Sequence, residues 1–507
     1  MGVCLGVDVE RLRAGIHEMG FEEAEALFAA LGSPAPKESY PQSKIEHFVV
    51  LYHENHAFDH IFGCLDLPGI DGVSNGTVNA TCGTSEYVCD HGPSFSLFAG
   101  KFYDGSESQC RSYPYDPQSD EYSVRNLGDS NTTTQMYSPE QLPVKTAIAE
   151  NFGVFNRLFT AVPTNSMPNH MFTQTGTSCG AKDNVFPWTD CNGSSLLYPQ
   201  WSLYDQLHVD GVDFGIFFSY DDLQPPDGYM KGLLRHLPKW RSMTDFKLRA
   251  RLGTLPAFSW VVPRYDATDH PCRDNREGEA VQKEVYETLR ASPVWNKTLL
   301  AILYDDGGGY YDHVVPPFEG VPADGAACSE GIDECSDPFD FRRLGLRSAA
   351  LLASPWIPKG SVFQEPTNGK YNTSRFDLTS VISTARDLFG LSSNLTARDD
   401  WSASFYELLA ETEPRTDTPE TLPDAPTITS SEDQPQHCAA KDGVCRGPDA
   451  LTNKQRRDLP LYSLLTNSPL PPDYETTMSS ADATAWLRHR VRHLLQNGVH
   501  PEAKKII

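Results

Sequence analysis

The 507-residue sequence has no uninterrupted hydrophobic run that approaches the ~18 residues needed for a membrane-spanning helix. A membrane channel is therefore excluded, and we expect at most peripheral membrane contact. Basic residues are also scarce, since 42 Lys and Arg stand against 68 Asp and Glu and give a formal net charge of −26. Because so acidic a surface repels phosphate backbones, nucleic-acid binding is not expected as the main function.

Loop-forming and aromatic residues are both abundant. The 37 Gly and 38 Pro indicate that much of the chain forms loops and turns. The 25 Phe, 21 Tyr and 8 Trp exclude a chain that is disordered throughout.

Cysteines and glycosylation sequons bear on the compartment. Several of the twelve cysteines form close pairs, and we expect Cys82–Cys89 and Cys179–Cys191 to be local disulfides. Seven N-x-S/T sequons occur, at Asn75, Asn79, Asn131, Asn192, Asn296, Asn372 and Asn394. Both features favour an oxidising, glycosylating route. We therefore expect a secreted or vacuolar/lysosomal protein, although the first fifteen residues lack the apolar stretch of a signal peptide.

The order of expected elements predicts an α/β fold. Apolar segments typical of buried strands occur at 45–52, 213–219, 258–262, 298–304 and 348–353, and helical patterns occur at 277–291 and 378–388. Strands that alternate with helices predict a three-layer α/β/α sandwich with a mostly parallel central sheet.

The two ends of the chain read as appendages to that sandwich. We expect an N-terminal helical appendage over 1–40, with its helix at 8–32, and a domain over 41–415 whose segment 68–140 forms long loops. Beyond it, residues 416–507 read as a Pro-rich linker followed by a helical extension that ends in an amphipathic helix at 481–496.

Two expected strands end in acidic or amide side chains. Glu54 and Asn55 follow the first strand closely, and Asp305 and Asp306 follow the strand at 298–304. In an open α/β sheet, ligands bind beyond the carboxyl ends of the strands. Oxygen ligands of this kind suit Ca²⁺, Mg²⁺ or Mn²⁺, or with histidine Zn²⁺ or Fe. The alternative from spacing alone is a simple Asp-Asp-Gly turn.

The segment 163–168 contains a candidate nucleophile, the hydroxyl group of Ser166. Ser166 is flanked by Pro163 and Pro168, which would hold it rigidly enough to act as a metal-activated nucleophile. The alternatives are that Ser166 is a structural turn residue and that His270 is an ordinary loop histidine.

Several motifs together carry a resemblance to a known family. Residues 54–60, E-N-H-A-F-D-H, resemble the E-N-R-S-F-D-H signature of the phosphoesterase family that contains bacterial phospholipases C, plant non-specific phospholipases C and a group of acid phosphatases. Residues 166–170, S-M-P-N-H, are similar to its T/S-x-P-N-R nucleophile motif, and 258–271 to its E-P-R-Y … H-P segment. Residues 305–313 parallel D-E-H-G-G-F-Y-D-H, and 354–360 parallel S-P-W-I-x-x-G. The resemblance extends over roughly residues 44–425.

The resemblance implies an alkaline-phosphatase-like fold, one divalent metal ion and a phosphoserine intermediate. Carried over by position, it implies that the metal ligands are Glu54, Asn55, Asp305 and Asp306. It implies Ser166 as the nucleophile, with His270 and His313 binding phosphate or moving protons. The substrate phosphate would contact Asn55, Asn169, His170 and Asp312. The identity of the ion stays open among Ca²⁺, Mg²⁺, Mn²⁺, Zn²⁺ and Fe.

The sequence also departs from the family pattern. The Arg residues of E-N-R and P-N-R are His56 and His170 here, and a family histidine is replaced at Gly307 and another at Leu378. These changes leave three functions open. The first is a phospholipase C-like hydrolase, the second a secreted acid phosphatase on monoesters, and the third a catalytically degenerate glycoprotein that binds phosphate-bearing ligands. No C/S-x-P-x-R stretch exists for a sulfatase nucleophile.

Overall fold

The computed structural model describes residues 44–73, 81–83, 135–164, 166–181, 197–219, 227–264, 267–270, 274–308, 310–324, 341–428, 451 and 453–504. The helix expected at 8–32 lies outside these ranges, and so do Cys89, Cys191 and four sequons, at Asn75, Asn79, Asn131 and Asn192.

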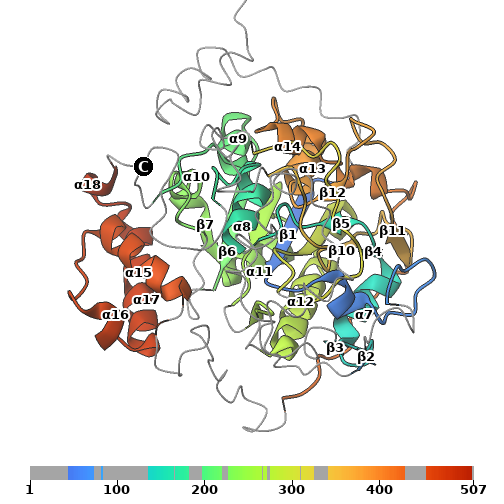
Figure 1. Ribbon diagram of the computed structural model, residues 1–507, viewed down its shortest axis with the longest axis horizontal. Coiled ribbons are helices and arrows are strands. Elements are labelled where there is room, and N and C mark those ends of the chain that lie inside the picture. Colours follow the sequence, from blue (N-terminus) through green and yellow to red (C-terminus); the bar gives the residue numbers. More distant parts are fainter. Residues whose placement is uncertain are drawn as a thin grey trace, which may run out of the picture.

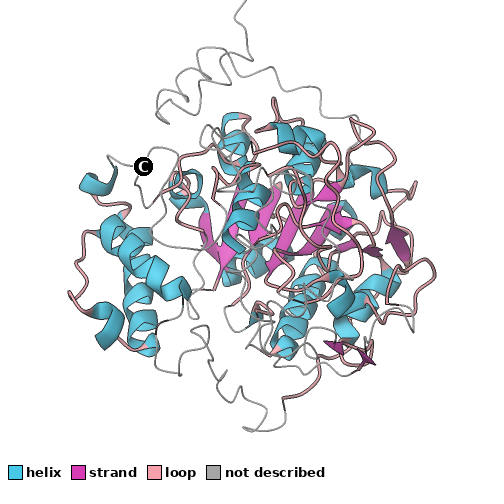
Figure 2. Ribbon diagram, in the orientation of Figure 1, coloured by secondary structure: helices cyan, strands magenta, loops and turns pink. Residues whose placement is uncertain are grey.

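An eight-stranded sheet forms the centre of the protein (Figure 2). In spatial order its strands are β11 (Ser361–Phe363), β4 (Gly153–Phe155), β10 (Leu351–Ala353), β9 (Thr298–Tyr304), β1 (His47–His53), β8 (Phe258–Val261), β6 (Phe214–Phe218) and β7 (Trp240–Ser242). Strand β10 is antiparallel to both neighbours, and every other pair in the sheet is parallel. Two small sheets pair β12 (Phe376–Asp377) with β5 (Leu158–Phe159) and β2 (Thr81–Cys82) with β3 (Gln135–Met136).

Helices cover both faces of the sheet, as the α/β/α prediction requires (Figure 1). One face packs against α8 (Ser166–Thr175), α9 (Leu203–Val209) and α13 (Ser380–Phe389). The other packs against α7 (Pro143–Asn151), α11 (Met243–Leu252) and α12 (Asn275–Arg290). Strand β1 shows the reason, because Phe48 and Val50 join the first cluster while Val49 and Leu51 join the second. Side chains alternate across a strand, so a strand buried on both faces is apolar throughout.

The remaining described helices are short or C-terminal. They are α3 (Phe58–Phe62), α10 (Lys231–Leu234), α14 (Ala397–Trp401), the 3₁₀ helices η3 (Leu237–Lys239), η5 (Trp295–Lys297) and η7 (Phe405–Leu408), and then α15 (Asn453–Thr466), α16 (Tyr474–Thr477), α17 (Ser480–Asn497) and α18 (Pro501–Lys504).

The expected elements in the described part of the chain are present with shifted ends. Strand β9 occupies the predicted residues, and the last strand shortens to three residues at β10. Helix α12 begins earlier than expected because Asp274 caps it, its side chain accepting a hydrogen bond from the backbone N–H of Arg276. The amphipathic helix predicted at 481–496 is α17.

The Pro-rich segment after residue 414 lies against helix α12 as far as it is described. Tyr286 and Lys283 of α12 donate hydrogen bonds to the backbone carbonyls of Pro419 and Leu422. Buried residues of α15, α17 and α18 belong to the same hydrophobic cluster as α8 and α13. The domain boundaries at residues 40 and 415 stay predictions.

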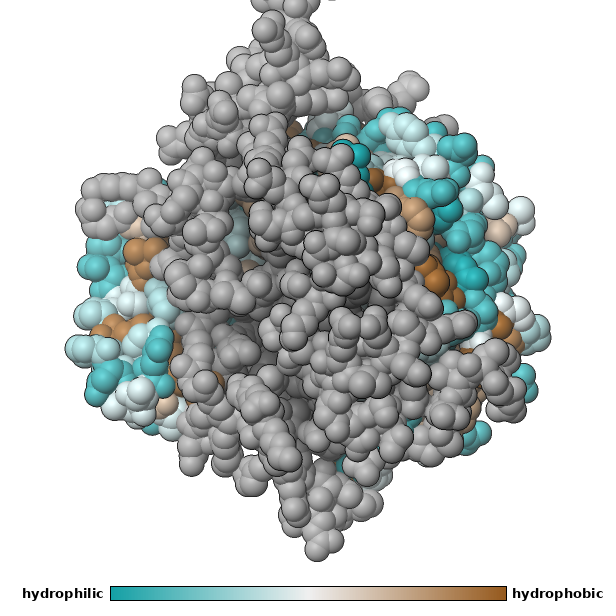
Figure 3. All heavy atoms as spheres, viewed as in Figure 1, coloured by the Kyte–Doolittle hydropathy of each residue, from teal (hydrophilic) through white to brown (hydrophobic). Residues whose placement is uncertain are grey.

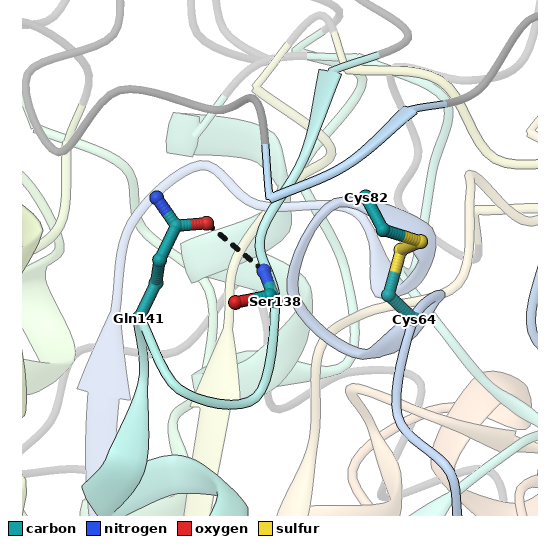
Figure 4. Close-up of a disulfide and its surroundings, with 4 residues drawn as sticks. All are labelled: Cys64, Cys82, Ser138 and Gln141. Atoms are coloured by element: carbon teal, nitrogen blue, oxygen red, sulfur yellow. Dashed lines mark hydrogen bonds between the residues drawn. A yellow bond between two sulfur atoms is a disulfide. The ribbon is translucent and has the colours of Figure 1, made fainter.

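One cysteine prediction is wrong. Cys82 forms a disulfide with Cys64, not with Cys89, and the two Cα atoms lie 5.8 Å apart (Figure 4). The reason is tertiary: Cys64 follows α3, and Cys82 lies on β2, whose partner β3 packs against α3. Cys179 is also disulfide-bonded. Its pairing with Cys191 stays a prediction.

The described surface and helices bear on membrane contact. Among the described residues, no helix combines the length and the hydrophobicity that crossing a membrane requires. Figure 3 shows hydrophilic and hydrophobic residues intermixed over the described parts of the face in view.

Candidate active site

The site is built at the carboxyl edge of β1 and β9. These strands are parallel neighbours with His53 paired to Tyr304, so the residues that follow them lie side by side. The backbone N–H of Asn55 donates to Asp305 Oδ1 at 2.7 Å, and Asn55 Nδ2 donates to Asp306 Oδ1 at 2.8 Å. The two strand ends therefore converge as the sheet rule predicts.

A tight backbone turn holds this convergence. Asn55 has φ of 64° and Gly308 has φ of 63°, both in the left-handed region. A Cβ on Gly308 would lie 2.0 Å from the carbonyl oxygen of Asn55, which only glycine avoids. The Gly308 N–H in turn donates to Asp306 Oδ1 at 2.7 Å.

Each aspartate uses one oxygen for the backbone scaffold and presents the other. Asp305 Oδ1 accepts from the N–H groups of Asn55 and Asp306, both at 2.7 Å. Asp305 Oδ2 faces His170, and Asp306 Oδ2 faces Ser166. The two Glu54 oxygens also face these residues, one each. Three carboxylates thus converge on one space between Ser166 and His170.

Ser166 begins helix α8 and points at this space. Its Oγ lies 3.2 Å from Glu54 Oε2 and 3.1 Å from Asp306 Oδ2. Asn169 holds the preceding loop, since its amide bonds Val162 N–H and O and Thr164 O. In this structure Asn169 therefore positions the serine, and its contact with substrate stays a prediction.

His170 lies one helical turn after Ser166, on the same face of α8. Its Nε2 is 3.2 Å from Asp305 Oδ2 and 3.8 Å from Glu54 Oε1. Its Nδ1 is 2.8 Å from Asp227 Oδ2, which also accepts from Gln174 Nε2 at 2.9 Å. Asp227 thus holds the imidazole through Nδ1, while Nε2 faces the carboxylates of Asp305 and Glu54.

The charges of the site are unbalanced. Burial raises the pKa of Asp306 well above its ordinary value, and the charges of Asp305 and Glu54 raise it further. Burial would also raise the pKa of Asp305, but the hydrogen bond from His170 holds it below its usual range. Burial opposes protonation of His170, yet Asp227, Asp305 and Glu54 raise its pKa well above normal.

These residues fit a divalent metal ion. The carboxylates of Glu54 and Asp305 crowd against the imidazole of His170, an arrangement that a cation would relieve. Among the described residues, Asn55 Oδ1 is buried and has no hydrogen-bond partner. A hard oxygen left without a partner beside two carboxylates is the kind of atom that a divalent cation binds.

His270 lies on the loop after β8, the other parallel neighbour of β1. The backbone N–H of Glu54 donates to Thr268 O at 2.8 Å, which ties this loop to the site. Asp269, with φ of 67°, is fully buried and forms an ion pair with Lys145 at 3.2 Å. Lys145 also pairs with Glu279 at 3.1 Å, so a buried charge network supports the histidine loop.

Asp312 and His313 form a second cluster, centred on Arg347. Arg347 Nε donates to Asp312 Oδ1 at 2.9 Å, and Arg347 Nη2 to Asp59 Oδ1 at 2.8 Å. His313 Nδ1 lies 2.7 Å from Asp59 Oδ2. Asp312 is fully buried and paired with a guanidinium, so here it stabilises the loops beneath the site. Its contact with substrate stays a prediction.

The replaced histidine positions have packing explanations. A Cβ on Gly307 would meet Leu346 Cδ1 at 2.8 Å, so Leu346 takes space that a side chain at 307 would need. Leu378 is buried in the cluster that contains α8. His56 is buried and stacks on Tyr310, with ring centroids 5.1 Å apart, and its Nε2 lies 2.9 Å from Asp269 O.

Sequence reasoning missed Asp227, Arg347 and Lys145. Asp227 is 57 residues from the histidine it holds, and Arg347 is 288 residues from Asp59. None of the three lies in a local motif. The only possible signal in the sequence is a charged residue in a segment expected to be buried, with no oppositely charged residue close by in the chain.

Fold and site together define a three-layer α/β protein in which a serine hydroxyl lies among carboxylates and an imidazole at the carboxyl edge of the sheet. The Phosphoesterase family profile matches residues 45–392. Non-specific phospholipase C6 of Arabidopsis thaliana is 34% identical over 418 residues, covering 77% of each chain. Phospholipase C B of Mycobacterium tuberculosis (strain H37Rv) is 25% identical over 435 residues, covering 74% of this chain and 80% of its own.

The similarity to solved structures is weaker. The lipoteichoic acid synthase LtaP of Listeria monocytogenes aligns with a TM-score of 0.34 and 9% identity, covering 94% of this chain and 98% of that one. The family match spans most of the chain. The protein belongs to the Phosphoesterase family and is a phosphoric ester hydrolase.

Proposed function

We propose that the protein is a metal-dependent phospholipase C that cleaves phospholipid head groups through a phosphoserine intermediate. The observation that carries the proposal is Ser166 Oγ, which lies within 3.2 Å of both Glu54 and Asp306 at the mouth of the acidic cluster. The names of the plant and bacterial relatives support a phospholipid substrate.

The chain's own residues supply the nucleophile and its orientation. Ser166 Oγ–H donates to a carboxylate of Glu54 or Asp306, which turns an oxygen lone pair towards the substrate phosphorus. The Oγ–P bond forms as the P–O bond to the glycerol breaks, and water then hydrolyses the phosphoserine. Helix α8 begins at Ser166, so its first N–H groups favour an anionic phosphate there.

A metal ion held by Glu54, Asn55, Asp305 and Asp306 would supply positive charge to the phosphate and lower the pKa of a nearby hydroxyl. The histidines have complementary roles. His313 is held by Asp59, and His270 lies on the loop bonded to Glu54, so both are suited to protonate the leaving oxygen.

We also propose that the protein follows the secretory route to the cell exterior or the vacuole/lysosome. The Cys64–Cys82 disulfide supports an oxidising compartment, because such bonds are rare in reducing ones. The sequon asparagines Asn296 and Asn372 are exposed, so an oligosaccharide can reach both.

The test compares three substrates on protein depleted of metal and then supplied with one divalent ion at a time. Phosphatidylcholine in vesicles, a simple phosphodiester and p-nitrophenyl phosphate are the substrates. The proposal expects diacylglycerol release from the vesicles to exceed monoester hydrolysis. Faster turnover of the monoester would identify an acid phosphatase, and no turnover with any ion would identify a binding protein.

A further inference from the structure

Helix α8 presents a second group to the acidic cluster besides its serine. His170 is almost completely buried, and its Nε2, a Glu54 oxygen and an Asp305 oxygen all lie within 4.8 Å of one another. We propose that His170 is a direct nitrogen ligand of the active-site metal ion, oriented by Asp227. This inference rests on the metal dependence proposed above and adds a ligand that the family pattern, with Arg at this position, does not predict.

The tautomer of His170 supports ligation. Asp227 Oδ2 is 2.8 Å from Nδ1, and an ionised carboxylate can only accept, so Nδ1 carries a proton. Without a cation, Nε2 donates to Asp305 Oδ2 at 3.2 Å in the same way, and a bound ion would take the place of that proton at the Nε2 lone pair. A histidine ligand whose other nitrogen donates to a carboxylate is the common second-shell arrangement of protein metal sites.

Asp227 is itself held in place by hydrogen bonds, and it therefore fixes the orientation of the His170 ring. Gln174 Nε2 donates to Asp227 Oδ2 at 2.9 Å, and Tyr204 Oη donates to Gln174 Oε1 at 2.8 Å. This buried chain from Tyr204 to His170 leaves the imidazole one orientation, towards Asp305.

The separations between the facing atoms suit ligands of one ion. Nε2 lies 3.2 Å from Asp305 Oδ2 and 3.8 Å from Glu54 Oε1. With metal–ligand bonds of about 2.0–2.2 Å, two ligand atoms on one ion lie no more than about 4.4 Å apart, and both separations are shorter than that. Asp305 Oδ1 is occupied by two backbone N–H groups, so Oδ2 is the oxygen offered to the ion.

A nitrogen ligand changes which ion the site selects. An all-oxygen set of carboxylates and an amide suits Ca²⁺, Mg²⁺ or Mn²⁺, whereas imidazole adds preference for Zn²⁺ or Fe²⁺. The structure therefore assigns the site to a transition metal or zinc.

The experiment measures coordination directly and does not depend on turnover. Full-length protein, depleted of metal and loaded with Mn²⁺, is examined by pulsed electron paramagnetic resonance for coupling to a bound ¹⁴N nucleus, and Zn²⁺ affinity is measured by calorimetry. The variants are His170→Ala and Asp227→Asn. The control is His236→Ala, because His236 is also buried and bonded to a carboxylate, Asp205, at 2.8 Å.

We expect ¹⁴N coupling in the wild type and in His236→Ala, and its loss in His170→Ala. Asp227→Asn should keep the coupling but bind Zn²⁺ about 10–100-fold more weakly, as second-shell changes do. A wild type that binds metal without ¹⁴N coupling, or a His170→Ala variant that keeps it, overturns this inference alone. A wild type that binds none of these ions overturns the metal dependence of the proposed function as well.

Discussion

Arg347 donates through Nε to Asp312 Oδ1 at 2.9 Å, and both side chains are fully buried. The same guanidinium reaches Asp59 and lies over the Phe58 ring, 4.1 Å from its centroid. One cation thus joins helix α3, the loop after β9 and the segment before β10. The edge of the sheet after β1 and the loop that carries His313 depend on it for their relative position.

Removing this cation should destabilise the protein strongly. Arg347→Met leaves two carboxylates buried without their partner, so the free energy of unfolding should fall by about 3–5 kcal/mol. Urea unfolding followed by tryptophan fluorescence measures it. The matched control is Arg490→Met, a less buried arginine that also lies over an aromatic ring, Trp486. Equal losses in the two variants would contradict the role of Arg347.

Gly308 should be irreplaceable for a local reason. In Gly308→Ala the new Cβ meets the Asn55 carbonyl oxygen at 2.0 Å, so the turn that presents Asn55 and Asp306 must open. We expect metal affinity to fall at least tenfold. Gly390→Ala has nearly the same backbone angle, φ of 65°, with nothing within 4 Å of the new Cβ. This control carries only the backbone cost of about 1 kcal/mol, and metal affinity should be unchanged.

Ser166→Ala should abolish turnover. Loss of the Oγ removes the covalent route, while loss of one hydroxyl should change the free energy of unfolding by no more than about 1 kcal/mol. Diacylglycerol release and urea unfolding measure the two effects. Ser259→Ala, which removes a buried hydroxyl from β8, should leave turnover intact. More than a tenth of wild-type activity in Ser166→Ala would indicate a metal-bound water as the nucleophile.

His313→Ala should slow the reaction by about 10²–10⁴-fold, the usual contribution of a general acid or base. Burial lowers the pKa of His313, but Asp59 more than offsets this and raises it above its ordinary value, so the protonated form is favoured. The rate of the wild type should therefore fall as pH rises through that pKa. The variant should lack this limb of the pH–rate profile, and an unchanged limb would exclude His313 as the acid.

His60 should make the protein sensitive to acid. Burial lowers its pKa to about 3, whereas an unfolded histidine titrates near 6.5. Between these values only the unfolded state binds the proton, so stability present above pH 6.5 is lost as pH falls. From pH 7 to pH 5 the loss should be about 2 kcal/mol for this group. Urea unfolding at both pH values measures it. His60→Phe should reduce that difference, whereas His489→Phe, at an exposed position, should not.

Most of the fold follows from the sequence because its strands are locally marked. Strands β1 and β9 are continuous apolar runs bounded by polar residues, the pattern of strands covered on both faces. The meeting of Glu54 and Asn55 with Asp305 and Asp306 follows from the same pattern, because residues beyond the carboxyl ends of adjacent parallel strands share one edge.

Pairings between distant residues came only from the tertiary structure. Sequence spacing favoured Cys82–Cys89, but Cys64 is the partner because α3 and β3 pack together. The motif implies a contact of Asp312 with phosphate, which stays a prediction, whereas its pairing with Arg347, 35 residues away, came only from the tertiary structure.

The sequence by itself therefore determined the α/β class, the family and the edge of the sheet where the acidic residues meet, because periodicity and motifs are local. Which atom each side chain faces was decided by packing alone. Asp227 reaches His170, and Arg347 reaches Asp59, only after helices and loops far apart in the chain have closed over the sheet. These charged side chains are buried with partners because burying an unpaired charge would cost several kcal/mol of folding free energy. That free energy depends on contacts between distant residues, so no local sequence pattern predicts it.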